Sequence, residues 1–254
     1  MTTYVLADTG ALTDRSLRHV LRSPDTIITT AVTPIALMLL FVYVFGGAID
    51  TGSAESYVDY MLPGILLITI ASGVAYTAYR LFLDLQGGIF ERFQSMPISR
   101  SSVLWAHVLT SLVATIASVT VVVGVALLMG FRTGASVGAW LGVLGILVLF
   151  TLALTWIAVI AGLSAKTVDG ASAFSYPLIF LPFISSAFVP TDSMPGPVAW
   201  FAENQPVTAV VDTVRALFAQ QPVGSDIWVA LAWLVGILLA AYAGAVAVYR
   251  RRIS

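Results

Sequence analysis

The chain of 254 residues is 59% apolar and only 10% charged, with a mean hydropathy of +0.95, whereas a soluble globular domain has about 25% charged residues. This composition predicts an integral membrane protein. Twelve Lys and Arg against thirteen Asp and Glu give a net charge of −1, so the chain lacks the positive surplus that binds nucleic-acid phosphates, and nucleic acid is excluded as a partner. With no cysteine and two histidines, it can form no disulfide, and no metal site is expected.

Six apolar segments are long enough to cross a bilayer, whose hydrocarbon core of about 30 Å needs about 20 helical residues. They span residues 26–49, 60–79, 103–130, 138–163, 171–189 and 227–249. The fold class predicted is therefore an all-α integral membrane protein with six transmembrane helices in a single domain. No signal-peptide cleavage pattern follows the first segment, so we expect it to be retained.

The positive residues predict the orientation, since cytoplasmic flanks are rich in Lys and Arg. With six spans both termini lie on one side, and ten positive residues fall there against two, Arg132 and Arg215, on the other. The ten are Arg15, Arg18, Arg22, Arg80, Arg92, Arg100, Lys166, Arg250, Arg251 and Arg252. We therefore expect a multi-pass protein of the cytoplasmic membrane with both termini in the cytoplasm.

No charged residue lies near the middle of a segment, which disfavours an ion-coupled carrier. Asp84, near the inner end of the second segment, is interpreted as a solvated helix-end charge. His107, one or two turns into the third, is expected to be a hydrogen-bonded or interface-facing ring rather than a metal ligand.

Residues 10–24 predict an amphipathic helix lying in the inner headgroup layer, with Arg15, Arg18 and Arg22 along one side. It is either a positive topology anchor or a helix that also contacts a cytoplasmic partner.

The inner loop after the second segment predicts a short helix at residues 89–95, in which Phe90 and Phe93 flank Glu91 and Arg92. A loop that only joins two helices needs no such aromatic and charged pairs. The pattern favours a protruding helix that fits a groove of another protein. The alternative is a solvated turn whose aromatic rings rest on lipid.

The outer stretch 190–226 predicts two short amphipathic helices, a helical hairpin that dips toward the outer leaflet. Asp212 and Arg215 are three residues apart and can form an ion pair. The hairpin either covers the space between the spans or only seals the outer helix ends against water.

Aromatic side chains in three segments could line a path for a bulky amphipathic molecule. The candidates are Tyr43, Phe45, Tyr76, Tyr79, Phe174, Tyr176, Phe180 and Phe183. Pro177 and Pro182 should loosen the fifth helix, and such breaks are tolerated where a helix faces protein or a cavity. The alternative is ordinary helix packing and interfacial aromatic belts. Gly124, Gly142, Gly145 and Gly162 should allow close helix approach in the third and fourth segments.

The chain has no phosphate-binding loop of the G-x-x-x-x-G-K-[ST] type, no H-E-x-x-H and no G-x-S-x-G. We therefore expect it not to be an enzyme and to hold no cofactor itself.

The run "DLQGGIFERFQSMPISRSSVL" (residues 84–104) resembles the signature of type-2 ABC exporter permeases, in the daunorubicin/doxorubicin-resistance-like branch. The outer run at residues 185–217, including "QPVT" and the later Asp212 and Arg215, resembles the same branch. The six segments, the first amphipathic helix and the outer hairpin agree with it. The likeness therefore extends over nearly the whole chain.

The resemblance implies a permease subunit that exports a hydrophobic or amphipathic molecule, a drug or natural product, by alternating access. It implies that helix 88–96, with Phe90, Glu91, Arg92, Phe93 and Met96, couples to two copies of a cytoplasmic ABC ATPase, which hold ATP and Mg²⁺. It also implies that Arg15, Arg18 and Arg22 lie beside that ATPase, and that a second permease chain, identical or related, faces this one in the bilayer.

The sequence departs from the family near His107 and Ser111, where relatives commonly have a basic and an acidic residue, so no charge pair is expected at the base of the third segment. Two other functions stay open from the sequence: export of a lipid or lipid-linked glycan, and a membrane scaffold or enzyme without an ATPase.

Overall fold

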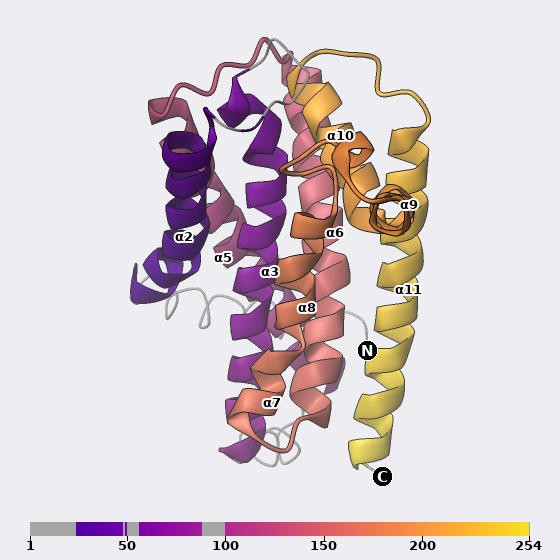
Figure 1. Ribbon diagram of the computed structural model, residues 1–254. Helices are drawn as coiled ribbons and strands as arrows, with labels where there is room; N and C mark the ends of the chain where they lie inside the picture. The colour runs from indigo at the N-terminus through magenta and orange to yellow at the C-terminus, as the bar shows by residue number, and fades with distance from the viewer. Residues whose placement is uncertain (1–23, 48, 50–55, 88–99, 254) are drawn as a thin grey trace.

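The computed structural model describes residues 24–47, 49, 56–87 and 100–253, which form helices and connecting loops without a strand (Figure 1). This confirms the all-α prediction. Four of these helices are long and apolar enough to cross a membrane. They are α3 (Tyr57–Gln86), α5 (Arg100–Leu128), α6 (Val137–Ser164) and α11 (Asp226–Ile253).

The first predicted span is shorter than the sequence suggests. Helix α2 (Pro24–Leu39) passes directly into a π-helical turn, η1 (Leu40–Phe45), and the helix ends at Gly46. Pro34 lies inside α2, and a π-helical turn is a local widening of the helix that often occurs at functional sites. The predicted end at residue 49 is therefore too late.

The fifth predicted span is not one continuous helix. It divides into α7 (Val168–Ala173), α8 (Ser175–Phe180) and the 3₁₀ turn η2 (Leu181–Ile184). Proline has no N–H, so Pro177 and Pro182 cannot donate to the carbonyls of Ala173 and Leu178 four residues earlier. The helix restarts near each proline.

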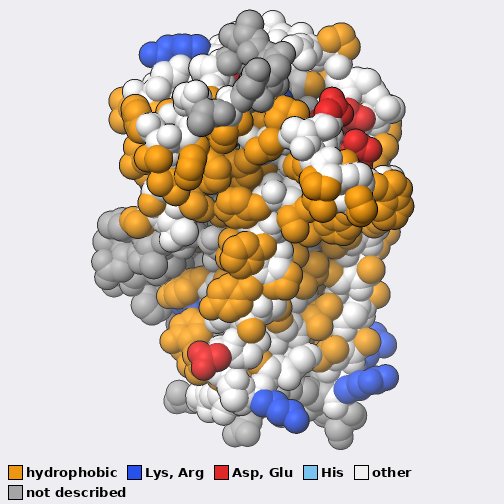
Figure 2. Space-filling view, viewed as in Figure 1, with side chains coloured by type: hydrophobic (Ala, Val, Ile, Leu, Met, Phe, Trp, Pro, Cys, Tyr) orange, Lys and Arg blue, Asp and Glu red, His pale blue; other side chains and the backbone are white. Residues whose placement is uncertain are grey.

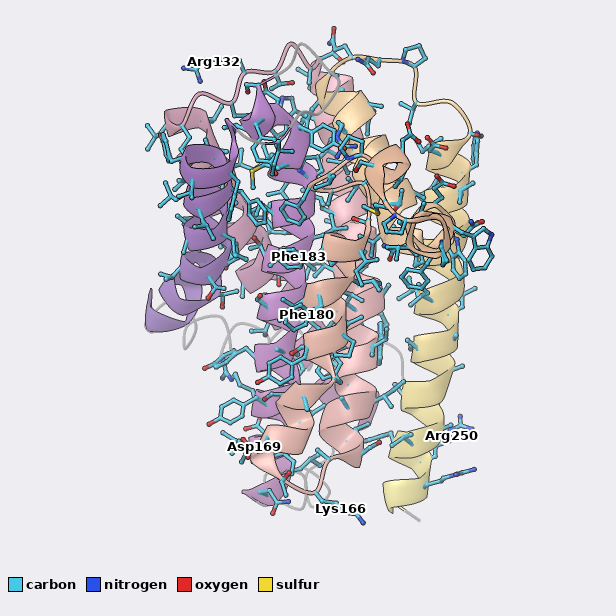
Figure 3. All side chains as sticks on the ribbon, in the orientation of Figure 1. Arg132, Lys166, Asp169, Phe180, Phe183 and Arg250 are labelled. Carbon is cyan, nitrogen blue, oxygen red and sulfur yellow. The ribbon has the colours of Figure 1, made fainter. Side chains whose placement is uncertain are left out.

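The charged side chains mark two ends of the bundle. Arg132 lies at one end, and Lys166, Asp169 and Arg250 lie at the other (Figure 3). Figure 2 shows hydrophobic side chains covering the face between these ends. We call the two ends of the bundle the Arg132 end and the Lys166 end.

Helix α3 is the centre of the bundle, and 78% of the residues in its most apolar stretch are buried. It crosses α6 closely at Gly162, where an added Cβ would lie 2.8 Å from the Ala78 carbonyl oxygen. Gly142 also faces a close neighbour, Leu217, but nothing lies within 4 Å of a Cβ at Gly124 or Gly145. The prediction of close approach is therefore right for two of the four glycines and wrong for the other two.

The outer stretch contains the 3₁₀ turn η3 (Thr191–Ser193), α9 (Gly196–Asn204) and α10 (Pro206–Phe218). In Figure 1 α9 is seen end-on, across the bundle axis, below the Arg132 end. Helix α10 packs against α6 and α11. Helical spacing predicts an inner face of Val207, Val210, Val211, Val214, Leu217 and Phe218, and all of these are buried except Leu217, which is half-buried.

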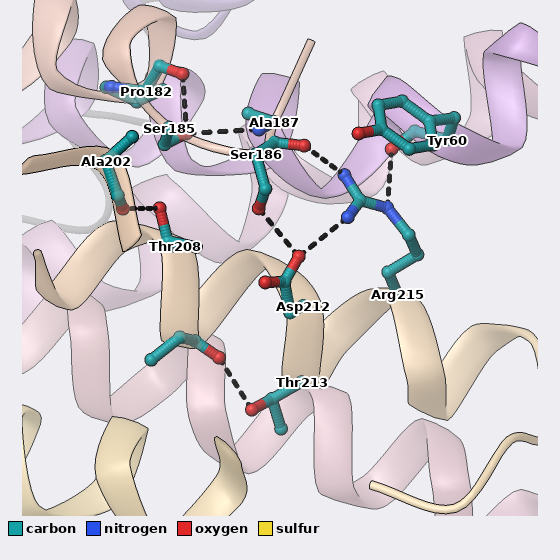
Figure 4. A network of polar contacts seen from close by, with 11 residues as sticks. Tyr60, Pro182, Ser185, Ser186, Ala187, Ala202, Thr208, Asp212, Thr213 and Arg215 are labelled. Atoms are coloured by element: carbon teal, nitrogen blue, oxygen red, sulfur yellow. Dashed lines mark hydrogen bonds and ion pairs between the residues drawn. The ribbon is translucent and has the colours of Figure 1, made fainter. Parts of the chain in front are cut away.

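Arg215 joins α10 to two distant parts of the chain (Figure 4). Its Nη1 donates to Asp212 Oδ1 at 2.7 Å, which confirms the predicted pair. Its Nη2 donates to the Ser186 carbonyl at 2.6 Å, and its Nε to the Tyr60 carbonyl at 3.1 Å. The guanidinium carbon also lies 3.9 Å from the centre of the Tyr60 ring, a cation–π contact.

The carboxylate of Asp212 also accepts a hydrogen bond from the Ser186 hydroxyl at 2.6 Å. The pair, Ser186 and the Tyr60 carbonyl therefore form one network, which ties α10 to the start of α3 and to the segment after η2.

Gln205, directly before α10, supports the broken helix. Its Nε2 donates to the carbonyls of Leu181 and Ile184, which belong to η2. Gln205 is itself buried, and an unpaired carbonyl in an apolar interior is costly. The hairpin thus supplies donors to backbone groups that no regular helix satisfies.

We predict that Arg215→Ala lowers stability by about 1–3 kcal/mol, because it leaves a partly buried carboxylate and two carbonyls without their charged donor. The stability of Arg215→Lys should lie between that of Arg215→Ala and that of the wild type, because lysine keeps the charge but not the planar array of donors. The apparent midpoint of thermal unfolding in mild detergent measures this. Arg250→Ala, at an exposed arginine of α11, is the control, and equal midpoints for Arg215→Ala and Arg250→Ala would contradict the role of the network.

Candidate functional site

A cluster of phenylalanine rings forms where η1 meets η2, and we call it the Phe41 cluster. Phe41 stacks on Phe188 with ring centres 4.8 Å apart, and Phe188 stacks on Phe183 at 4.9 Å. Phe45 lies 5.6 Å from Phe41, and Phe180 lies 6.2 Å from Phe183. The cluster therefore joins the end of the first apolar helix to the break in the fifth.

The outer side of this cluster is open. Phe180 is 61% exposed and Phe45 is 41% exposed, and Tyr43 and Tyr176, on the same two helical segments, are 69% and 60% exposed. Figure 3 shows Phe180 and Phe183 along α8 and η2, on the side that faces the viewer. These uncovered rings form an aromatic surface that is open to the lipid and to an apolar molecule within it.

The structure separates the eight predicted path residues into groups. Phe45, Phe180 and Phe183 join the Phe41 cluster, whereas Phe174 is half-buried against the core. Tyr76 and Tyr79 lie further toward the Lys166 end on α3, with ring centres 6.0 Å apart and the Arg80 guanidinium 5.8 Å from the Tyr76 ring.

The sequence interpretation missed Phe41, the ring that links the two helical segments. Its position four residues before Phe45 was the available signal, because residues four apart share a helix face. Its contact with Phe188, far along the chain, has no such local signal.

A second polar site lies near the Lys166 end, between α3 and α5. Nε2 of His107 is 3.2 Å from Oδ2 of Asp84. The expectation of a polar contact for His107 is thus confirmed. Asp84 lies in the last turn of α3 with 34% of its side chain exposed, as expected of a helix-end charge. Its carboxylate also reaches across to His107, so the expectation of no charge pair at the base of the third segment is wrong. The pair comes from two helices, so spacing within one of them could not reveal it.

A buried hydroxyl ladder lies beside this pair. Thr77 of α3 donates to Ser111 of α5 at 2.7 Å, and Ser111 lies 3.4 Å from the hydroxyl of Thr155 in α6. Trp105 packs edge-on against Trp156, with ring centres 5.3 Å apart. Helices α3, α5 and α6 are therefore joined by polar and aromatic contacts at this level.

The Asp84–His107 pair lies on α3 and α5, the two helices that flank the predicted coupling segment. That segment, with Phe90, Glu91, Arg92, Phe93 and Met96, lies outside the described residues, as do Arg15, Arg18 and Arg22 of the first predicted helix. The Asp84–His107 pair thus connects the last turns of α3 before the segment with the second turn of α5 after it.

Among the described residues, no group of three His, Asp or Glu side chains could hold a metal ion. The two sites instead combine an uncovered aromatic surface with a polar connection between helices. This arrangement can bind an apolar molecule and transmit movement, and it presents no nucleophile paired with a base.

The family model described as ABC-2 type transporter matches residues 7–219. The daunorubicin resistance ABC transporter permease protein DrrB1 of Streptomyces coeruleorubidus is 30% identical over 233 residues, which cover 89% of this chain and 77% of the relative. The probable doxorubicin resistance ABC transporter permease protein DrrC of Mycobacterium tuberculosis is 26% identical over 249 residues, 97% of this chain and 89% of the relative. These matches, together with the apolar helices, show that the chain belongs to the ABC-2 type transporter family as a multi-pass membrane permease.

Proposed function

We propose that this permease is the membrane subunit of an ATP-driven exporter that moves a hydrophobic or amphipathic molecule, a drug or natural product, out across the cytoplasmic membrane by alternating access. Permeases of this family work with an ATPase subunit, and the two relatives are named for resistance to daunorubicin and doxorubicin. The observation that carries the proposal is the uncovered Phe41 cluster beside the broken helix. ATP and Mg²⁺ belong to the partner ATPase, of which two copies serve two permease chains.

In this proposal the chain crosses the membrane six times. The four long helices supply four crossings, and α2 with η1 supplies a fifth. The sixth is α7, α8 and η2, which stop short of the Arg132 end. Helix α10, held to η2 by Gln205 and to Ser186 by Arg215, covers the remaining depth.

The Lys166 end is the cytoplasmic end of this proposal. Lys166, Arg250 and Arg251 belong to it, whereas Arg132 and Arg215 belong to the opposite end, and positive residues stay in the cytoplasm. Both chain termini then lie in the cytoplasm.

Single cysteines test this orientation, because the natural sequence has none. In intact cells, Arg132→Cys should react with a membrane-impermeant maleimide added outside, whereas Lys166→Cys should react only after the membrane is opened. Both positions are exposed in the structure, so each acts as the accessibility control for the other. The reverse pattern would invert the topology and move the ATPase site to the wrong end.

The path of the cargo in this proposal runs along α2, α3 and α8, between two facing permease chains that are identical or related. The Phe41 cluster offers apolar ring surface, and Tyr43 and Tyr176 add phenol groups on the same segments. An amphipathic molecule with fused rings can rest on such rings and donate or accept at the phenols. The broken helix supplies the movable part, since α8 and η2 lack a continuous backbone ladder.

Daunorubicin serves as the probe for this path. Phe180→Cys should react with a maleimide, since a thiol facing a water-filled path can ionise, and daunorubicin should slow that reaction. Trp228→Cys, 71% exposed on α11 and away from α8, should react at a rate that daunorubicin leaves unchanged. A Phe180→Cys thiol that is inert in the assembled transporter, or equal protection at both positions, would remove α8 from the path.

Coupling to the ATPase occurs through the segment between α3 and α5. We assign Phe90 and Phe93 to the groove of the ATPase, with Glu91, Arg92 and Met96 at the contact and Arg15, Arg18 and Arg22 beside it. Movement of that segment acts on both α3 and α5, because Asp84 and His107 join the two helices next to it. ATP binding can then shift the balance between inward-open and outward-open states.

The proposal as a whole is tested by copurification and by coupling in the complex with the ATPase. Phe90→Ala with Phe93→Ala should remove a stoichiometric ATPase from the purified chain. Glu91→Ala or Arg92→Ala should leave the chain in the membrane but separate ATP hydrolysis from export. Glu203→Ala, on exposed α9 at the other end, is the matched acidic control. Normal coupled export by all the segment variants, or a wild-type chain recovered without any ATPase, would overturn the exporter proposal.

A further inference from the structure

An apolar cavity lies between α5 and α6, and none of its lining residues belongs to the Phe41 cluster. Its volume is about 250 Å³, and it is partly open to the outside. Leu66 and Ile70 of α3 form its floor, and Trp140 and Phe218 lie at the level nearest the Arg132 end. We call it the α5–α6 crevice.

The crevice is elongated along the helices. On α6 the lining residues recur at helical spacing from Trp140 through Leu144 and Leu147 to Thr151, and on α5 they extend from Thr115 to Val123. A rise of 1.5 Å per residue makes the α6 wall about 16 Å long. This is the shape of a slot for a linear molecule that lies parallel to the helix axes.

The walls require an apolar occupant. Most of the lining is aliphatic or aromatic. The hydroxyl of Thr120 donates to the Ile116 carbonyl at 2.8 Å, and that of Thr151 donates to the Leu147 carbonyl at 2.7 Å. Because these hydroxyls donate within their own helices, they do not need a polar ligand.

A polar recess of about 210 Å³ adjoins the crevice at Phe218, which lines both. The recess is lined by Arg132 and Arg215, with Asp59 as its acidic residue. The backbone N–H of Arg132 donates to Asp59 at 3.2 Å. Arg215 is already paired with Asp212, so Arg132 and Asp59 bring one charge of each sign to the recess, at the end of the bundle where Arg132 lies (Figure 3).

We propose that the crevice binds one acyl chain of a bilayer phospholipid, with the headgroup phosphate at the recess beside Arg132. Both walls are helices apolar enough to cross a membrane, and only 28% of the residues in the apolar stretch of α5 are buried within the chain. The medium beside such a helix is lipid hydrocarbon, whose chains lie along the same axis. An apolar slot that ends in a polar recess containing Arg132 matches the apolar chain and the polar phosphate headgroup of a phospholipid.

The bound lipid supports the end of α10. Phe218 packs edge-on against Trp140 and Phe131, with ring centres 5.1 and 5.2 Å away. Its carbonyl accepts a hydrogen bond from Thr133 at 2.6 Å. An acyl chain beneath these rings fills the space under the helix that carries Arg215.

The test is native mass spectrometry of the full-length permease released from nanodiscs of palmitoyl-oleoyl phosphatidylglycerol. The wild type should retain one phospholipid per chain. Val119→Phe and Val148→Phe fill the crevice from opposite walls and should lower retention by about tenfold, the loss expected when about two methylene groups are excluded. Val121→Phe and Leu141→Phe, exposed positions on the same helices outside the crevice, should retain the lipid.

Arg132→Ala separates headgroup from chain. It should lower retention of phosphatidylglycerol in the same assay, and equal retention would remove the headgroup placement. Wild-type retention by both filled variants, equal loss in the control variants, or a retained mass that is not a phospholipid would overturn the lipid site. Size-exclusion profiles show that each variant is folded, and the two walls give independent variants. The assay needs no ATPase and no cargo, so its result is independent of the exporter proposal.

Discussion

The structure depends on one constraint, which is that backbone groups inside an apolar bundle must find partners from the protein itself. The prolines of the fifth apolar segment remove donors at the depth where water is absent. Where that segment ends, Gln205 and Arg215 donate to backbone carbonyls of η2 and Ser186, and Arg215 also donates to the carbonyl of Tyr60. A long outer stretch that could have been a plain loop is therefore part of the membrane fold.

The contacts of Gln205 and Arg215 belong to the fixed part of the permease, around α10, and distinguish it from a more weakly held part, α8. Helix α10 packs along its whole inner face against α6 and α11, and its polar groups are bound at both ends. Helix α8 carries only short helical turns and presents exposed rings. A surface that must open and close for cargo is expected at the weakly held element, beside a rigid one.

The sequence predicted those features that local spacing determines. Four of the apolar segments predicted the four long helices, and the three-residue interval between Asp212 and Arg215 predicted their ion pair. The helical spacing of the apolar residues after Pro206 predicted most of the inner face of α10. In each case the partners lie within one or two helical turns, where geometry follows from the sequence alone.

The sequence could not predict contacts between distant segments. The Tyr60 carbonyl that Arg215 contacts is 155 positions away, and any backbone carbonyl could have served. Asp84 and His107 belong to different helices, so their meeting depends on the relative rotation of α3 and α5. The glycines show the same limit, because the close crossing at Gly162 and the open surface at Gly145 come from the same helix with the same residue type.

Helix α3 connects the two ends of the molecule. It is 30 residues long, which corresponds to about 45 Å, and it carries Asp84 near one end and Tyr60 near the other. Its middle is the most buried part of the bundle, so its halves cannot move independently without opening the core. Helix α3 is therefore one packed element that joins the Asp84–His107 pair to the Arg215 network. The broken helix α8, which packs on α3 but lacks its continuity, is where a displacement of α3 can be converted into a change of the exposed aromatic surface.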